Sequence, residues 1–146
     1  MKNADSKESG DASGENPGEK PRGELFIQAA AMPADTNPNG DIFGGWLLSQ
    51  MDIAGGIAAR SHSGGRTVTI AVESMIFKKP VQVGDVVSCY ADLEKVGRTS
   101  MTFLIEVWTL RRDSFVREKV TEGVFTYVAI GPDGRPREIE QESTNT

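Results

Sequence analysis

The sequence predicts an α+β domain in which one antiparallel sheet wraps around a single long central helix. One stretch of the chain, Ile42–Arg60, is apolar or small at nearly every position and is long enough for a helix of roughly four to five turns. The residues after it change to alternating, β-branched segments that are typical of strands. Short turns between the last of these segments indicate an antiparallel meander. A sheet with only one helix to cover it is therefore the expected architecture.

The chain of 146 residues suits a single domain with one core. Residues 1–22 are rich in charged and small polar side chains and cannot bury enough apolar surface to offset their conformational entropy, so we expect a disordered N-terminal tail. Residues 138–146 have a similar composition and are expected to form a flexible C-terminal tail. The folded domain is expected to span residues 23–137.

Proline, glycine and asparagine mark the boundaries of the expected elements. A first strand over Glu24–Met32 ends at Pro33, and the loop that follows contains an Asn-Gly pair. Asp41 is the candidate N-cap of the helix, and Gly64 and Gly65 supply its stop. The later strands are expected over Arg66–Lys79, Val86–Val96, Thr99–Arg111 and Lys119–Ile130.

Composition argues against several classes of protein. The net charge of −5 disfavours a general nucleic-acid binder, which presents a basic face. The single cysteine, Cys89, excludes an intrachain disulfide and a cysteine-rich metal site, and its alternating apolar surroundings predict a packed strand residue. No apolar run reaches the roughly 18 residues of a membrane span. Residues 1–22 also lack the apolar region of a signal peptide, so a reducing, cytoplasmic setting is expected.

Asp52 is the one acidic residue within the expected helix, which is otherwise mostly apolar or small. The helix is apolar on nearly every side, which is typical of a buried helix, and we expect the sheet and a partner subunit to cover it. Asp52 lies in its middle, and no cation is found among its neighbours one turn away, which are Leu48, Ser49, Gly55 and Gly56. Burying an unpaired carboxylate is costly, so Asp52 is a candidate general base or nucleophile. The alternatives are that it faces solvent or caps a backbone amide across an interface.

Four glycines, Gly44, Gly45, Gly55 and Gly56, lie within the helix although each costs about 0.5–1 kcal/mol relative to alanine. Such a cost is usually offset by the close approach of a strand, another helix or a ligand. At the helix start, Gly44 and Gly45 present unpaired amides and a dipole that favour negative charge, which suits an oxyanion formed from a carbonyl. For a Gly-Gly pair alone, packing beneath a loop is the simpler explanation.

The segment Met32–Asp52, MPADTNPNGDIFGGWLLSQMD, closely resembles the signature of the YciA-type acyl-CoA thioesterases. These are single-hotdog relatives of the two-domain brain-type acyl-CoA hydrolases. The resemblance continues in the motifs Val72–Pro80, Val83–Asp85, Val96–Arg98 and Val124–Thr126. It covers nearly the whole domain and leaves out the tails. Pro38 stands where relatives often have alanine, a change that a loop tolerates.

The resemblance implies a hotdog fold, in which a curved antiparallel sheet wraps around the long helix. Members of the family pair their sheets into dimers, commonly assemble into hexamers as trimers of dimers, and build each active site from residues of both subunits. The resemblance also implies that Asp52 is the catalytic carboxylate and that the amide of Gly44 or Gly45 polarises the thioester carbonyl. The residues that line the thioester site correspond to Asn39, Gly40, Asp41, Phe43, Gly44 and Gly45.

The implied reaction is the hydrolysis of an acyl-CoA to a free acid and CoA, with no metal or cofactor. Asp52 either activates a water molecule or attacks the thioester itself to form an anhydride, and the sequence leaves both routes open.

The chemistry of CoA suggests which further residues would contact it. The phosphates of CoA call for a basic rim despite the acidic total. The first candidates, which lie in family motifs, are Lys78, Lys79 and Arg98, and the others are Arg60, Arg66, Arg135 and Arg137. The alternative for each is a solvated surface charge. Ser74 is a candidate contact for the pantetheine arm or the interface. An acyl tunnel along the helix would have Trp46, Met51 and Phe77 as walls, unless these side chains belong to the core.

Two other functions compete with the thioesterase. A non-catalytic acyl-CoA sensor on the same fold would keep the pocket but has no need of the acid, so Asp52 within an intact Ser-Gln-Met-Asp motif argues against it. A dehydratase needs an Asp/His pair, and the only histidine, His62, falls at the end of the helix, where an exposed position that suits the helix dipole is expected. Turnover of a simple acyl-CoA separates all three functions.

Overall fold

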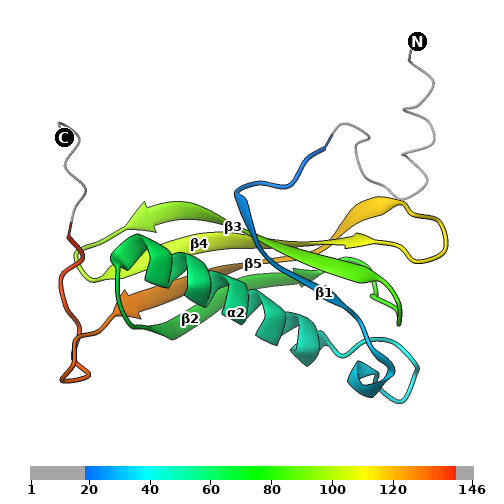
Figure 1. Cartoon of the computed structure of the whole chain (residues 1–146), viewed down its shortest axis with the longest axis horizontal. Coiled ribbons are helices and arrows are strands. Elements are labelled where there is room, and N and C mark those ends of the chain that lie inside the picture. Colours follow the sequence, from blue (N-terminus) through cyan, green and yellow to red (C-terminus); the bar gives the residue numbers. More distant parts are fainter. Residues whose placement is uncertain (1–18, 141–146) are drawn as a thin grey trace, which may run out of the picture.

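The computed structural model describes residues 19–140, and its elements are one sheet and one long helix (Figure 1). The elements are β1 (Glu24–Ala30), the short 3-10 helix η2 (Pro33–Asp35), α2 (Gly44–Ser63), β2 (Thr67–Phe77), β3 (Val86–Val96), β4 (Ser100–Leu110) and β5 (Arg117–Ala129). The strands form a 5-stranded sheet in the order β1-β3-β4-β5-β2, and every neighbouring pair is antiparallel. Figure 1 shows α2 crossing one face of this sheet. The predicted α+β architecture, an antiparallel sheet around one central helix, is confirmed.

The helix α2 begins at Gly44 rather than at Ile42. The amide of Ile42 donates to the carbonyl of Val81 at 2.9 Å, so the chain is tied to a neighbouring segment just before the helix. Phe43 occupies the N-cap position and contributes no side-chain hydrogen bond. The prediction of Asp41 as the N-cap was therefore wrong, because a tertiary hydrogen bond rather than a local cap decides where the helix starts.

The other end of α2 agrees with the prediction. Gly64 follows the last helical residue in the left-handed conformation, with φ of 80°, and its amide donates to the carbonyl of Arg60 at 2.8 Å. A residue with a Cβ adopts this left-handed conformation only at a cost in free energy, which explains why a glycine ends the helix. Within residues 19–140, no helix has the length and apolar character needed to cross a membrane.

One face of α2 packs against the sheet through small and apolar residues. Its buried members are Leu47, Met51, Ala54, Gly55, Ala58 and Ala59. At Gly55 a Cβ would overlap the hydroxyl group of Tyr127 and would lie 2.7 Å from Cδ1 of Ile105. The expected reason for a glycine in mid-helix, a close approach by a neighbouring element, therefore holds at Gly55. At Gly56, by contrast, a Cβ would meet no atom of the described chain within 4 Å.

The folded part extends past the predicted domain at both ends. Arg22 donates hydrogen bonds to Asp92 at 2.8 Å and to Glu94 at 2.6 Å. Ile139 is only 4% exposed, and its amide donates to the carbonyl of Arg98 at 2.8 Å. Arg22 and Ile139, which the sequence analysis placed in the tails, thus contact the sheet through ion pairs and a buried apolar side chain. The remainder of both predicted tails, residues 1–18 and 141–146, lies outside the described residues.

Cys89 is a packed residue of β3, as the alternating pattern predicts. Its side chain is 0% exposed. Burial raises the pKa of the thiol to about 12, so the thiol stays protonated at neutral pH.

Gly55→Ala is predicted to destabilise the protein, whereas Gly56→Ala is not. A methyl group at position 55 has to displace Tyr127 or lift the helix, and such overpacking costs about 1–3 kcal/mol. This cost offsets or exceeds the roughly 1 kcal/mol that alanine contributes through helix propensity, which Gly56→Ala receives without a clash. Urea titration of both variants measures the two free energies of unfolding. A value for Gly55→Ala equal to or above that of Gly56→Ala would contradict the close approach.

Candidate active site

Asp52 is held by two hydroxyl groups that come from different strands. Its Oδ1 accepts a hydrogen bond from Oγ1 of Thr69 on β2 at 2.7 Å and another from the hydroxyl of Tyr127 on β5 at 2.9 Å. The Asp52 side chain is only partly buried, so it remains accessible from one side. Burial, together with the charge of Asp52 and the hydrogen bond to it, raises the pKa of Tyr127 well above its ordinary value. The phenol therefore stays protonated at physiological pH and acts as a donor.

Asp52 lines a cavity of about 270 Å³ between α2 and the strands β2 and β5. The lining residues are Gly45, Leu48, Ser49, Asp52, Thr69, Val72 and Phe125. A mostly apolar hollow with a few convergent polar groups is typical of a small-molecule site. The structure thus brings together two of the predicted residues, Asp52 and Gly45, and adds Thr69, which the sequence analysis missed.

The first turn of α2 presents unpaired amides beside this cavity. The amides that follow Gly45 donate to the carbonyl of Phe43 at 3.1 and 3.3 Å, whereas those of Gly44 and Gly45 find no protein acceptor among residues 19–140. No acidic side chain lies in this turn to offset the positive end of the helix dipole. The helix start is therefore suited to bind an anion or a developing oxyanion.

A second cavity, of about 300 Å³, lies between the helix start and the chain that follows β2. Its lining residues are Asn37, Asp41, Ile42, Gly44, Leu47, Phe77, Lys78, Lys79, Pro80 and Val81. Four of the predicted site residues, Asp41, Gly44, Lys78 and Lys79, therefore lie together at this place although they come from two distant parts of the sequence.

Asn37, rather than the predicted Asn39, contributes to this cavity. Oδ1 of Asn37 accepts hydrogen bonds from the amide of Asn39 at 2.9 Å and from the amide of Asp41 at 3.1 Å. Asn39 is exposed and lines neither cavity. The signal that could have identified Asn37 is its place at the start of a turn, because an asparagine there bonds its own backbone two residues on.

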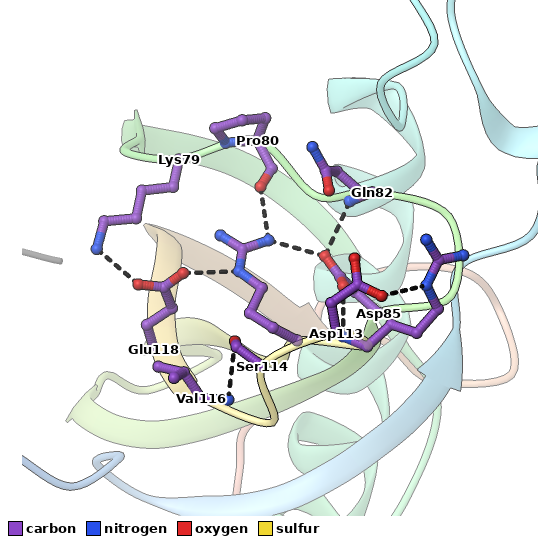
Figure 2. Close-up of polar contacts among 10 residues, drawn as sticks. Lys79, Pro80, Gln82, Asp85, Asp113, Ser114, Val116 and Glu118 are labelled. Carbon is purple, nitrogen blue, oxygen red and sulfur yellow. Dashed lines mark hydrogen bonds and ion pairs between the residues drawn. The ribbon is translucent and has the colours of Figure 1, made fainter.

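Lys79 belongs to a network of partly buried ion pairs (Figure 2). Its Nζ lies 2.8 Å from Glu118, whose other oxygen lies 2.6 Å from Nε of Arg111. Nη1 of Arg111 lies 2.8 Å from Asp85 and also donates to the carbonyl of Pro80 at 2.8 Å. Since Glu118 compensates its charge, Lys79 is a poorer candidate than predicted for binding a phosphate, and its contacts instead fix the chain that lines the second cavity.

Lys78 and Arg98 lie at opposite ends of the sheet. The amide of Lys78 donates to the carbonyl of Val120 near the start of β5 at 2.7 Å. Arg98 lies in the turn between β3 and β4, beside Ala129 at the end of β5, and its side chain is 3.6 Å from Glu138. At about 3.3 Å per residue, the two places are roughly 30 Å apart along β5. One chain therefore does not bring both predicted phosphate ligands to one cavity.

The other predicted residues divide between core, cavity and surface. Met51 is 0% exposed and belongs to the core, whereas Phe77 is 52% exposed and lines the second cavity. Trp46 is partly buried and packs against the core. Phe43 is exposed at the helix N-cap. Ser74 is exposed on β2 with a left-handed φ of 55°, where the pairing with β5 is irregular, and it lines neither cavity.

Comparison with known proteins finds similarity to thioesterases. A model of the thioesterase superfamily matches residues 39–115. The chain is 56% identical over 122 residues to the acyl-CoA thioester hydrolase YciA of Salmonella typhimurium, which covers 82% of this chain and 92% of that protein. It superposes on a hexameric thioesterase from Yersinia pestis with a TM-score of 0.81 and 54% identity, covering 84% of this chain and 100% of that chain. An aspartate-to-alanine mutant of a hexameric broad-specificity acyl-coenzyme A thioesterase also has a TM-score of 0.81, with 50% identity over 84% of this chain and 90% of that chain.

The ion-pair network predicts that stability depends on pH in the acid range. Burial by itself raises the pKa of Asp85 and of Glu118, but backbone amides and Arg111 at Asp85, and Lys79 and Arg111 at Glu118, outweigh it and leave both pKa values below normal. Carboxyl groups whose pKa is lower in the folded state stabilise the protein above their unfolded-state pKa, and this contribution is lost as the pH falls. The free energy of unfolding is therefore expected to decrease as the pH drops below the ordinary values of 4.5 for glutamate and 3.8 for aspartate.

Denaturant titrations across this pH range test the prediction on Asp85→Asn, with the exposed Asp113→Asn as the matched control. We expect Asp85→Asn to be less stable than wild type at neutral pH and to lose less stability on acidification. An acid dependence of Asp85→Asn as steep as that of Asp113→Asn would show that the network does not cause it.

Proposed function

We propose, from the premise that this chain belongs to the YciA-type acyl-CoA thioester hydrolases of the thioesterase superfamily, that Asp52 is the carboxylate that drives its hydrolysis of acyl-CoA. The observation that carries the proposal is the pair of hydroxyl groups that hold Oδ1 of Asp52 at the wall of a small cavity, with Gly45 at the helix start in the same lining. A fixed carboxylate next to unpaired amides is suited to attack at a carbonyl carbon, because the amides stabilise the oxygen as it becomes negative.

Two routes use the same groups. In the first, Asp52 takes a proton from a water molecule while the water oxygen bonds to the thioester carbonyl carbon; the carbon–sulfur bond then breaks, and the sulfur of CoA leaves with that proton. In the second, a carboxylate oxygen of Asp52 displaces the sulfur to form an anhydride, which water hydrolyses to the acid. Both routes consume water and release a free acid and CoA.

Gly45 is the better candidate of the two predicted amide donors. It shares the lining of one cavity with Asp52, whereas Gly44 lines the neighbouring cavity, where a Cβ would lie 3.6 Å from the ring of Phe77. A well-placed donor to an oxyanion is worth about 3–4 kcal/mol of transition-state stabilisation. The amide of Gly45 is therefore our choice for the group that polarises the thioester carbonyl.

The phosphate-bearing part of CoA is assigned to the second cavity. Lys78 is exposed there and provides a cation, while the charge of Lys79 is compensated by Glu118. Arg98 lies at the other end of the sheet, so in our proposal it contacts CoA only from another subunit. This arrangement agrees with an active site built from residues of more than one chain.

An exposed apolar face supports assembly into oligomers. β2 is an edge strand of the sheet, and such an edge leaves backbone groups unpaired. The exposed apolar residues of β2 and α2 include Leu48, Ile53, Ile57, Val68, Ile70 and Val72. Proteins normally cover an apolar surface of this kind. Since related thioesterases are hexameric, we propose that this chain forms a homo-oligomer of the same size, built from dimers through this face.

The competing functions find less support. A dehydratase would need His62 near Asp52, but His62 is exposed at the far end of α2 and lines a different cavity. A sensor would bind acyl-CoA without turnover, whereas the relatives that define the family are thioester hydrolases.

Asp52→Asn is predicted to lower kcat at least 100-fold, because an amide neither accepts a proton from water nor forms an anhydride. Release of CoA thiol from short- and long-chain acyl-CoAs measures the loss, with the exposed Asp113→Asn as the control for an equal change of charge. An Asp52→Asn variant that keeps its activity would show that the carboxylate is structural. A single wild-type turnover in water labelled with heavy oxygen identifies the anhydride route if the label enters the carboxylate of Asp52, since direct attack by water places the label in the released acid.

Ile70→Glu is predicted to break the oligomer, because it places a charge on the exposed face of β2, where Ile70 is 57% exposed. Light scattering should show a smaller particle, and activity should fall with it because each site needs a second chain. Val116→Glu, on the hairpin between β4 and β5, provides the control. If Ile70→Glu keeps the mass of the wild type, the proposed face is not the interface.

A further inference from the structure

Tyr127 binds Asp52 at two points. Its hydroxyl donates to Oδ1 of Asp52 at 2.9 Å and lies 3.2 Å from the main-chain oxygen of the same residue. The side chain of Tyr127 is 1% exposed, so it cannot reach a substrate. A fully buried hydroxyl that reaches the carboxylate and the main-chain oxygen of Asp52, and that also interacts with Thr69, can influence a substrate only through these neighbours.

The position of this hydroxyl is set by two aromatic neighbours and by the glycine above it. The ring of Tyr127 meets Phe103 edge to face, with ring centres 6.1 Å apart, and stacks against Phe125, with centres 6.4 Å apart. Gly55 leaves the space beneath the helix that the hydroxyl occupies. Because these rings pack against Tyr127 and the helix has no side chain at Gly55, the hydroxyl lies close enough to donate to Asp52.

The contacts of the carboxylate are asymmetric. Oδ1 of Asp52 accepts hydrogen bonds from the hydroxyl groups of both Thr69 and Tyr127, whereas Oδ2 accepts no hydrogen bond from residues 19–140. Two donors that converge from β2 and β5 fix the rotation of the carboxylate and leave its second oxygen available. Burial and the charge of Asp52 raise the pKa of Tyr127, so the phenol is protonated and donates to the carboxylate.

We propose that Tyr127 is a positioning residue of the thioesterase, which holds the carboxylate of Asp52 so that Oδ2 meets the water or the thioester carbon. The inference rests on the proposed function of Asp52. Misplacing a reacting group by about 1 Å lowers the rate on the order of 100-fold. Removal of the Tyr127 hydroxyl is therefore expected to lower the rate of the chemical step. Substrate binding depends on other residues and changes little.

The test is Tyr127→Phe, which keeps the ring packing and removes only the hydroxyl. We expect kcat to fall about 10- to 100-fold while KM stays within about twofold of wild type. Tyr90→Phe removes a hydroxyl that lies 3.4 Å from Arg117 on the same sheet, and it serves as the matched control with unchanged kcat. Circular dichroism and particle mass confirm the fold, and the assays run well below the melting midpoint of each variant.

A double-mutant cycle separates positioning from a structural role. If Tyr127 acts only through the carboxylate, Tyr127→Phe should lower kcat in the wild-type background but should not lower it further in Asp52→Asn. A loss of the same size in both backgrounds would overturn the inference, as would a kcat of Tyr127→Phe equal to that of wild type. A rise in KM equal to the fall in kcat would also overturn it, because it would reveal general distortion of the site.

The cycle also distinguishes the two proposals. An active Asp52→Asn overturns the role of Asp52 and the role of Tyr127 with it. An inactive Asp52→Asn beside a fully active Tyr127→Phe overturns only the positioning role.

Discussion

The close approach of α2 to β5 at Gly55 is the constraint on which the rest of the structure depends. A Cβ there would overlap the hydroxyl of Tyr127, so the helix lies this near the sheet only because the residue is a glycine. The same closeness lets Tyr127 reach Asp52 from β5, while Thr69 reaches it from β2. Core packing and the geometry of the carboxylate are thus set by one contact, and a change that separates helix from sheet disturbs both.

The segment after β2, which lines the second cavity, is held by an ion-pair network. Arg111 joins the carbonyl of Pro80 to the carboxylates of Asp85 and Glu118, and Glu118 in turn holds Lys79 (Figure 2). Partly buried ion pairs of this kind often add little net stability, since desolvation opposes the attraction between the charges. Their evident effect here is geometric: they fix the segment after β2 opposite the helix start, and the second cavity lies between the two.

The single chain contains some parts of the proposed site and not others. The carboxylate, the unpaired amides of the helix start and Lys78 lie around two neighbouring cavities. Arg98 is at the other end of the sheet, and the apolar face formed by β2 and α2 is uncovered. An oligomer in which another chain covers this face would account for both facts, because it buries the apolar surface and brings a distant part of a second copy towards the cavities.

Local patterns in the sequence determined the elements of this protein: the strands, the central helix, its stop at Gly64 and the packed position of Cys89 all follow from periodicity and backbone preference. The family motif pointed to Asp52 and the helix-start glycines as the site. Only the tertiary structure decided which groups these residues meet. Tyr127 is 75 positions from Asp52, and Lys79 is 39 from Glu118, so their contacts depend on strand register and on how closely the helix packs. The same holds for the helix start, where the amide of Ile42 is bound to the carbonyl of Val81. Such contacts form between segments that become neighbours only on folding, and the local sequence around either partner carries no sign of the other.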